Sequence, residues 1–296
     1  MENRICGLKI LNSQIDPSNA EVSTLVQIER ITSTTLGRGR FLGPRCAYSS
    51  TVEVAYPMRE SSPLYAKYAE CDISGLSMHV VIPEPCLWDP ESPFIYDVAV
   101  ELWESGKLCD QFRTSHGLYF RKLTPHGLRW NGRPMTLSGV ERYQLTEPEA
   151  LELRQAGYNA LLVPVRPDTD ALCSLADKLG LFVLARLATR ADYASADELK
   201  GHVSLLGFVL DSRLLEDPLV KAAPTWVAGQ AQLMGLESDQ LPPETLPDGF
   251  NFLLTSEDAR QNLSRAKLPL LIRRSKRDGG KEEPLPEANS LGSICS

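Results

Sequence analysis

The sequence predicts a β-sandwich in the N-terminal part of the chain and a strand–helix repeat of (β/α) barrel or doubly wound type after it. Residues 1–122 carry short alternating or β-branched runs without a clear helical pattern. From Met135 the runs become short and fully apolar, as in buried parallel strands. Strand starts then recur roughly every 20 to 25 residues, the spacing of successive strand–helix units. A chain of 296 residues is long enough for both parts.

Four segments carry the β prediction. Glu21–Ile31 is rich in branched side chains, and Leu76–Pro85 ends in prolines that stop a strand. Phe94–Ser115 alternates apolar and polar residues on both sides of a Glu-Ser-Gly turn, which predicts a hairpin. Gly127–Leu137 predicts a second hairpin, because its Asn-Gly turn tolerates the positive φ angles of a type I′ turn.

The second half contains one strand too few for a closed barrel of eight. We therefore expect an incomplete or degenerate barrel over residues 125–274, after a sandwich over residues 1–124. Beyond Arg274 the chain is polar and rich in Gly and Pro, which predicts a disordered tail over residues 275–296. The predicted strands are Met135–Gly139, Ala160–Val165, Leu181–Leu187, Leu205–Leu210, Thr225–Gln230, Phe250–Leu254 and Leu268–Arg273.

Helices are expected between these strands. Thr146 with Glu149, and Ser195 with Glu198, have the spacing of a capping box at a helix N-terminus. Ser256 is followed by two acidic residues, which favour the positive end of a helix dipole. A further helix is predicted from an apolar stripe at helical spacing, formed by Leu172, Leu175, Ala176 and Leu179.

Composition excludes several classes of function. The net charge of −7 argues against a nucleic-acid-binding surface, which requires clustered basic residues. No apolar run approaches the roughly 18 residues of a membrane span. The N-terminal residues lack an apolar stretch of signal-peptide length, so we expect a cytoplasmic protein.

No metal site, disulfide framework or cofactor is expected. The seven cysteines are scattered without a Cys-x-x-Cys motif, and the four histidines lack metal-ligand spacing. The glycine-rich segment Gly37–Gly43 has no strand–helix context for phosphate binding, so we interpret it as a flexible loop. We interpret the four tryptophans as packing residues rather than sugar-stacking platforms.

Five motifs occur in a consistent order through the middle of the chain. Trp88–Tyr96 contains the pattern Trp-x-Pro-x-x-Pro-x-x-Tyr, and Asn131–Pro134 reads Asn-Gly-x-Pro. Ser138–Tyr143 follows as the end of the first strand of the repeat. Gly157–Pro167 contains an Asn-Ala pair, and Asp177–Val183 reads Asp-x-Leu-Gly-Leu-x-Val. Together these motifs resemble glycoside hydrolase family 2, which contains β-galactosidases and β-glucuronidases. The resemblance implies an immunoglobulin-like sandwich followed by a TIM-type barrel.

The catalytic positions of that family are altered in this chain. A retaining glycosidase uses two carboxylates about 5 to 5.5 Å apart, at the C-terminal ends of barrel strands. The resemblance aligns the acid/base position with Arg213 and the nucleophile position with Arg274. A guanidinium neither donates a proton near neutral pH nor attacks an anomeric carbon. Polar positions of the family that also differ here are Ser138, Glu141, Tyr143, Leu162, Pro164, Val165, Ala185 and Arg186.

Three functions follow as hypotheses. The first is an inactive binding or interaction module of carbohydrate-metabolism type, with a carbohydrate or anionic ligand. The second is an active O-glycosyl hydrolase in which Glu141 and Asp211 act as a relocated carboxylate pair. The third is a scaffold that assembles with a protein partner or a second copy, which would cover an open barrel edge.

Arginines recur at the predicted C-terminal ends of the strands. They either form a positive rim that binds an anion, or pair individually with nearby acidic residues as ordinary loop arginines. The sequence is consistent with both interpretations. The five residues are Arg142, Arg166, Arg186, Arg213 and Arg274.

Overall fold

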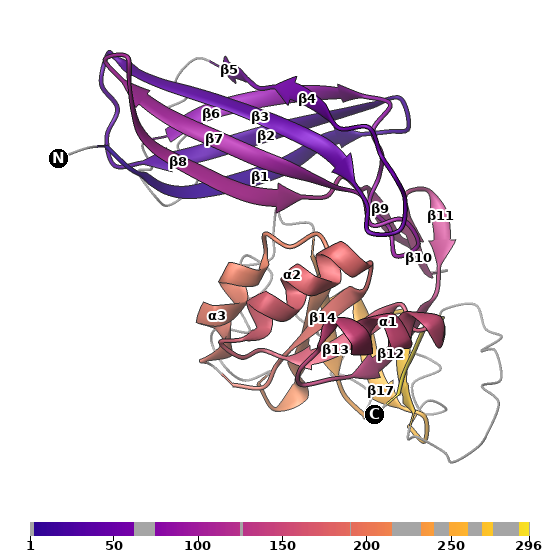
Figure 1. Ribbon diagram of the computed structural model, residues 1–296. Helices are drawn as coiled ribbons and strands as arrows, with labels where there is room; N and C mark the ends of the chain where they lie inside the picture. The colour runs from indigo at the N-terminus through magenta and orange to yellow at the C-terminus, as the bar shows by residue number, and fades with distance from the viewer. Residues whose placement is uncertain are drawn as a thin grey trace. The chain divides into compact units, whose positions relative to one another are not determined.

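The computed structural model contains two compact units, Met1–Phe120 and Arg121–Ser296, and each is described by itself (Figure 1). The sequence placed the domain boundary after Thr124. The structure describes residues 3–61, 75–124, 127–189, 191–214, 232–239, 249–259, 268–274 and 290–295.

The first unit is a β-sandwich of two four-stranded sheets. Their strand orders are β1-β2-β6-β5 and β4-β3-β7-β8, and every pairing within them is antiparallel. The strands are β1 (Ile5–Ile15), β2 (Asn19–Ile28), β3 (Thr35–Arg45), β4 (Val54–Pro57), β5 (Arg59–Ser61), β6 (Gly75–Pro83), β7 (Ile95–Glu104) and β8 (Lys107–His116).

Side chains along the strands alternate between buried and partly exposed positions, as the sequence predicts, and the buried ones form the sandwich core. On β7, Tyr96, Val98, Val100 and Leu102 are buried, whereas the residues between them are partly exposed. The predicted hairpin is confirmed: β7 and β8 are joined through Ser105 at φ 50° and Gly106 at φ 76°.

The expectation of a flexible loop over Gly37–Gly43 was wrong, because this segment lies within β3, between β4 and β7. Gly37 and Gly39 make room for side chains that face β3 from the other sheet. A Cβ atom on Gly39 would lie 2.6 Å from Met58 Sδ and 3.0 Å from Met78 Cε. The glycines therefore serve close packing between the two sheets.

The second unit begins with a three-stranded antiparallel sheet of order β11-β10-β9. Its strands are β9 (Arg121–Thr124), β10 (Gly127–Trp130) and β11 (Arg133–Met135). The predicted Asn-Gly turn is confirmed, with Asn131 at φ 49° and Gly132 at φ 81°. Trp130 is buried and packs edge-on against Phe182, with ring centroids 4.8 Å apart.

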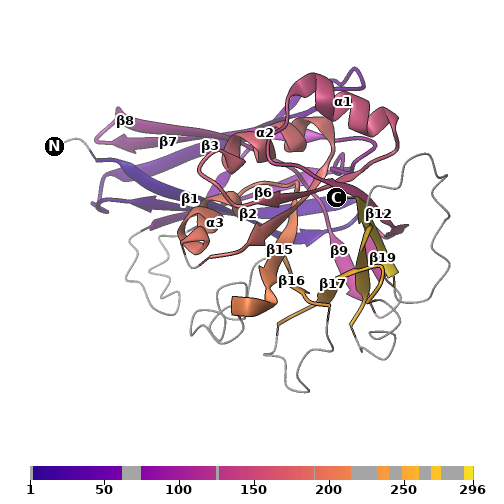
Figure 2. The same cartoon turned by 90° about the horizontal axis from the view of Figure 1, so that it is seen from below.

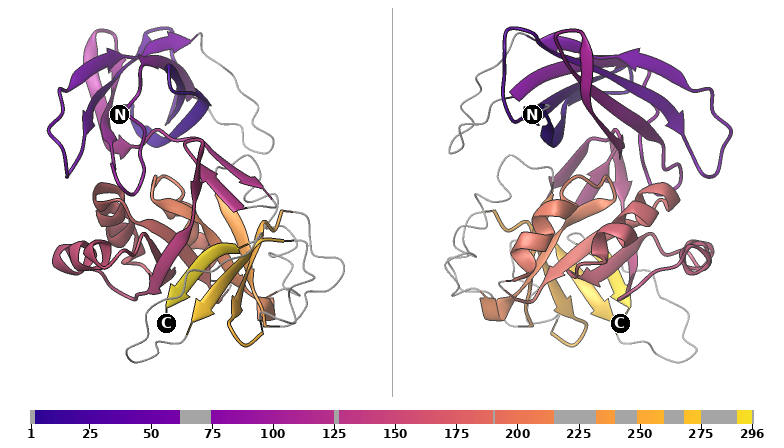
Figure 3. Two further views of the ribbon diagram at one scale, coloured as in Figure 1. Left: turned by 90° about the vertical axis from the view of Figure 1, so that its right-hand side faces the viewer. Right: turned by 60° about the vertical axis from the view of Figure 1, so that its left-hand side comes forward.

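Eight parallel strands then form a closed barrel (Figures 2 and 3). The predictions of seven strands and of an incomplete barrel were wrong. The predicted strand Thr225–Gln230 lies outside the described residues, and the corresponding place in the barrel is taken by β16. The strands are β12 (Leu137–Glu141), β13 (Ala160–Pro164), β14 (Phe182–Leu187), β15 (Leu205–Asp211), β16 (Leu233–Glu237), β17 (Phe252–Ser256), β18 (Leu270–Arg274) and β19 (Ser290–Cys295).

The barrel is closed by β19, which lies within the segment predicted to be a disordered tail. This strand pairs in parallel with β18 on one side and β12 on the other. Gly292 has φ 132°, and a Cβ atom there would collide with the carbonyl oxygen of Leu137. Glycine is therefore required where the last strand meets the first. Residues 275–289 of the predicted tail lie outside the described part of the chain.

Three helices connect the first four barrel strands: α1 (Glu147–Gln155), α2 (Thr169–Leu179) and α3 (Asp192–Leu199). The capping box of Thr146 and Glu149 is confirmed at α1. Ser195 lies inside α3 instead of capping it, because the helix already begins at Asp192. The Asp192 carboxylate accepts hydrogen bonds from the backbone of Ala188 and Thr189, which precede the helix. Of the helix predicted after Ser256, residues 260–267 lie outside the described chain. No helix in the described ranges is long and apolar enough to span a bilayer.

The apolar stripe predicted for α2 is confirmed. Leu172, Ala176 and Leu179 are buried in one core cluster with the barrel strands, and Leu175 packs against it. The parallel strands beneath are buried on both faces, which explains their continuous apolar sequences.

Candidate functional site

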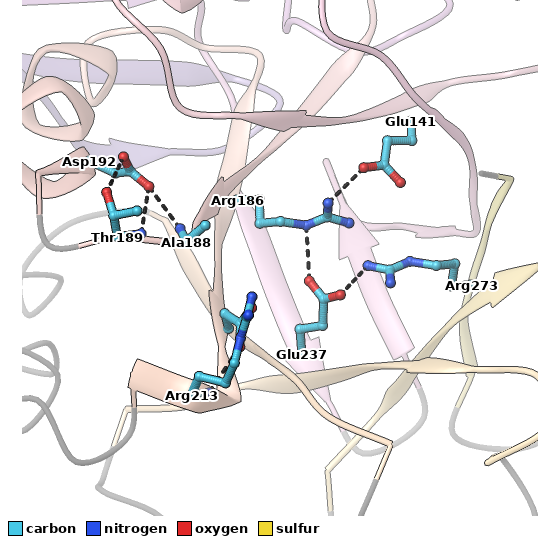
Figure 4. A network of polar contacts seen from close by, with 9 residues as sticks. Glu141, Arg186, Ala188, Thr189, Asp192, Arg213, Glu237 and Arg273 are labelled. Atoms are coloured by element: carbon cyan, nitrogen blue, oxygen red, sulfur yellow. Dashed lines mark hydrogen bonds and ion pairs between the residues drawn. The ribbon is translucent and has the colours of Figure 1, made fainter.

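A layer of four charged side chains lies at the C-terminal ends of alternate barrel strands. Glu141 ends β12, Arg186 lies near the end of β14, Glu237 ends β16 and Arg273 lies near the end of β18. Inward-facing side chains from alternate strands form layers in barrels of this kind. We call these four residues the mouth layer (Figure 4).

The mouth layer is a chain of ion pairs with alternating sign. Arg186 Nη1 lies 2.6 Å from Glu141 Oε1, and Arg186 Nε lies 2.9 Å from Glu237 Oε2. Glu237 also pairs through its other oxygen with Arg273. Two carboxylates and two guanidiniums thus neutralise one another, and Arg186 bridges both glutamates (Figure 4).

These ion pairs are largely shielded from solvent. The side chains of Glu141, Arg186 and Glu237 are 14%, 17% and 22% exposed, and that of Arg273 is 27% exposed. Removing one partner of a buried ion pair leaves an uncompensated charge, which typically costs about 3–5 kcal/mol when burial is complete. Each of the four side chains therefore depends on its ion-pair partners to compensate its charge.

Two guanidinium nitrogens in the layer are buried without an acceptor. Arg186 Nη2 and Arg273 Nε make no hydrogen bond to the residues that the structure describes. The contact of Arg186 Nε with Glu237 is an ion pair rather than an aligned hydrogen bond, although its 2.9 Å separation is short. The layer thus has more buried donors than acceptors positioned to receive them.

Asp211, the second carboxylate of the predicted relocated pair, interacts with Arg213 and does not belong to the mouth layer. Arg213 donates from Nε to Asp211 Oδ1 at 2.9 Å, and its own backbone N–H donates to the same oxygen. The hydrogen bond from the Arg213 side chain lowers the pKa of Asp211, with a smaller contribution from the charge of Arg186. Glu141 and Asp211 share no direct contact among the described residues; Glu141 is brought together with Glu237 instead.

The remaining rim arginines have local partners. Arg166 Nε lies 3.2 Å from Asp168, and Arg274 Nε lies 3.5 Å from Glu257. Arg142 donates from Nη1 to the backbone oxygen of Glu141 at 2.9 Å. Such pairing favours the reading of these residues as ordinary loop arginines. An anion-binding role for the five-arginine rim stays a prediction.

Sequence reasoning missed Glu237, because it placed the fifth strand too early. It ended a predicted strand at Arg273 but missed the residue, because the family resemblance pointed to its neighbour Arg274. A signal was available in the strand sequences. Leu137–Glu141 reads LSGVE and Leu233–Glu237 reads LMGLE, so both glutamates follow the pattern Gly-x-Glu at the end of an apolar run. Both glycines are close to a neighbouring strand, since a Cβ atom on Gly139 or Gly235 would collide with the side chain opposite.

His202 has the structural role that the sequence indicated. Its Nδ1 lies 2.7 Å from Asp177 and its Nε2 lies 3.0 Å from Asp170, both on α2. Carboxylates only accept hydrogen bonds, so both ring nitrogens must carry protons. Burial of the ring opposes this charged form, but the two carboxylates outweigh it and raise the pKa of His202 to about 9. His126, Trp226 and Cys71 lie outside the described residues.

The described part of the chain contains no group of three or more His, Cys, Asp or Glu side chains arranged to hold a metal ion. Its six described cysteines are free thiols.

Comparison with known proteins gives consistent relatives. A family model described as glycosyl hydrolases family 2 matches residues 50–118. A β-glucuronidase from Bacteroides fragilis is 29% identical over 143 residues, which cover 44% of this chain and 20% of that protein. A β-galactosidase from Klebsiella pneumoniae is 24% identical over 151 residues, covering 47% of this chain and 13% of the relative.

Solved structures share the fold over the whole chain. A calcium-binding mutant of Bacteroides uniformis β-glucuronidase 2 superposes with a TM-score of 0.72 at 14% identity. The match covers 99% of this chain and 47% of that protein, so the chain spans less than half the length of this structural neighbour. From the family match, the curated relatives and the shared fold, we conclude that the chain is related to the glycosyl hydrolases of family 2.

Proposed function

We propose that this chain is a non-hydrolytic relative of the family 2 glycosidases, which binds a ligand at the barrel mouth instead of cleaving a glycosidic bond. The proposal includes an immunoglobulin-like type for the sandwich, a TIM type for the barrel and a cytoplasmic location. The observation that carries it is the mouth layer, in which Arg186 bridges Glu141 and Glu237.

Glycoside hydrolysis needs one carboxyl group that donates a proton and a second that attacks or activates water. Both acidic side chains of the mouth layer are acceptors in ion pairs with Arg186. The guanidinium lies between the two groups that would have to flank a scissile bond. The positions that the family uses for its catalytic carboxylates align with Arg213 and Arg274, which supply no substitute.

A second candidate is an active hydrolase with relocated carboxylates. Asp211 is poorly suited to the role of proton donor, because the contact with Arg213 lowers its pKa. Glu141 and Glu237 are the stronger pair, since both contact one guanidinium from strands on either side of it. Activity would require Arg186 to move away from both glutamates when substrate binds.

The reason for the scaffold hypothesis does not hold in the structure. It rested on an open barrel edge that a partner would cover, and the eight strands instead form a closed barrel. Assembly with a protein partner or with a second copy of the chain stays a prediction.

Turnover of a panel of nitrophenyl β-glycosides, including the galactoside and the glucuronide, tests the proposal. We expect no release of nitrophenol above a heat-denatured control over many hours. Release that is abolished in both Glu141→Gln and Glu237→Gln would establish the relocated pair and refute the inactive assignment. Asp211→Asn serves as the matched carboxylate control outside the mouth layer.

A further inference from the structure

The outer face of the sandwich sheet that contains β3, β7 and β8 carries an apolar row outside the core (Figure 1). Trp103 on β7 alternates with the inward-facing side chains of that strand and is only partly buried. The strand register places Leu36 and Leu108 directly opposite Trp103, so the three side chains share the outer face. Leu36 is 41% exposed and Leu108 is 48% exposed. Adjacent exposed apolar side chains with polar neighbours are typical of interaction surfaces.

Two arginines without partners lie on the same face. Arg40 on β3 and Arg113 on β8 are exposed, and both are opposite Ala99 of β7 in the strand register. Their strands flank β7 on its two sides, so their backbones are about 10 Å apart. Neither guanidinium has a hydrogen bond or ion pair within the described ranges. Because Ala99 is small, no large side chain of β7 fills the space between them.

The charge of this face is positive, although the chain as a whole carries −7. A third arginine, Arg38, places its guanidinium 4.9 Å from the centroid of the Trp103 ring. Two carboxylates of β7 point to the same side. Asp97 pairs with Arg45 at 2.6 Å, whereas Glu101 accepts from Trp103 Nε1 at 3.0 Å. Three arginines therefore surround one carboxylate that no arginine in the described residues neutralises.

This combination fits a protein segment that carries both an apolar side chain and carboxylates. Arginine and tryptophan are enriched at protein–protein interfaces, and a guanidinium binds a carboxylate through two parallel hydrogen bonds. We propose that this face of the sandwich binds an extended acidic segment of a partner protein. We call it the arginine face, and its residues are Leu36, Arg38, Arg40, Trp103, Leu108 and Arg113.

The spacing of the two parts specifies the segment. Trp103 and Ala99 are four residues apart on β7, which corresponds to about 13 Å along the strand. An extended segment with an apolar residue and a carboxylate four residues apart would place the first on the apolar row and the second between Arg40 and Arg113.

Fluorescence anisotropy of the full chain with a dye-labelled peptide tests the inference. The probe is a serine- and glutamate-rich peptide that carries one Phe and, four residues later, a Glu. One companion peptide has Gln in place of every Glu, and another has Ser in place of the Phe. We expect the probe to bind at least tenfold more tightly than either companion, and its affinity to fall as salt is added.

Absence of binding, or equal affinity for a companion peptide, would overturn the proposal. An oligoadenylate RNA of the same net charge is the competing ligand. Tighter binding of this RNA than of the probe would identify a nucleic-acid surface and refute the acidic segment.

Variants assign the binding to the arginine face. Combined Arg40→Gln and Arg113→Gln should weaken binding of the probe at least tenfold. Combined Arg4→Gln and Arg59→Gln removes the same charge at exposed arginines outside this face, and it should leave the affinity unchanged. Equal weakening in both double variants would mean that net charge alone attracts the peptide, and would refute the site.

Circular dichroism checks that the variants are folded. If the first double variant does not fold, Arg113→Gln alone on the edge strand β8 provides the same test. The arginine face belongs to the first unit and contains no residue of the mouth layer. The peptide experiment therefore succeeds or fails independently of the turnover assay.

Discussion

Arg186 on β14 reaches Glu141 on β12, with 2.6 Å between Nη1 and Oε1, although the strand β13 lies between them in the barrel. The contact is possible because inward-facing side chains of alternate strands meet above the barrel core. The same guanidinium also reaches Glu237 on β16. One arginine thereby forms ion pairs with both carboxylates of the mouth layer.

Arg186→Met should destabilise the second unit by about 2–4 kcal/mol, less than the loss of a fully buried pair because Glu141 and Glu237 keep some solvent contact. Urea unfolding followed by circular dichroism measures the change. Adding Glu141→Gln to this variant should restore part of the stability, because one unpaired charge is removed. Arg213→Gln is the control, since its side chain is 81% exposed, and it should unfold like the wild type.

Gly292→Ala should prevent the barrel from closing. Its φ of 132° is unfavourable for a residue with a side chain, and the new Cβ atom would collide with Leu137. We expect loss of the cooperative unfolding transition of the second unit, measured by calorimetry. Gly201→Ala is the matched control, because a Cβ atom there would have nothing within 4 Å. A Gly292→Ala protein as stable as the wild type would contradict the described path of β19.

Stability should fall at alkaline pH through His202. Its pKa is raised from 6.5 to about 9 in the folded protein, so the contribution is fully present below pH 6.5 and is lost as pH rises through 9. The size of this effect is on the order of 3 kcal/mol. Urea unfolding between pH 6 and 10 should show this loss in the wild type and a flatter profile in His202→Gln. An NMR titration that places the imidazole pKa below 7 would refute the paired state.

Thr146→Ala should remove the cap of α1 at a cost of about 1 kcal/mol. The Thr146 backbone N–H donates to Glu149 Oε2 at 2.8 Å, and the capping box is complete in both directions. Thermal unfolding measures the change. Ser195→Ala offers a contrast, because Ser195 has the same sequence signal but lies inside α3, and we expect a much smaller loss.

Local structure in this chain follows from residues that are close together in the sequence. The Ser105–Gly106 and Asn131–Gly132 turns, the cap at Thr146 and the strands from β12 to β15 depend on neighbours in the chain, and each was predicted close to its observed place. Backbone conformational preference and hydrophobic periodicity are sufficient for such elements.

Closure of the barrel and the composition of its mouth depend on contacts between residues far apart in the sequence. Gly292 lies in a segment that the sequence pattern predicted to be a disordered tail, and its place is fixed by pairing with Leu137, far away in the sequence. In the sequence, nothing distinguishes Glu237 and Arg186 from other charged residues. They meet because the strands that carry them belong to one closed barrel. Long-range parallel pairing, which no local pattern encodes, sets which charges meet and therefore whether a carboxylate is available for chemistry.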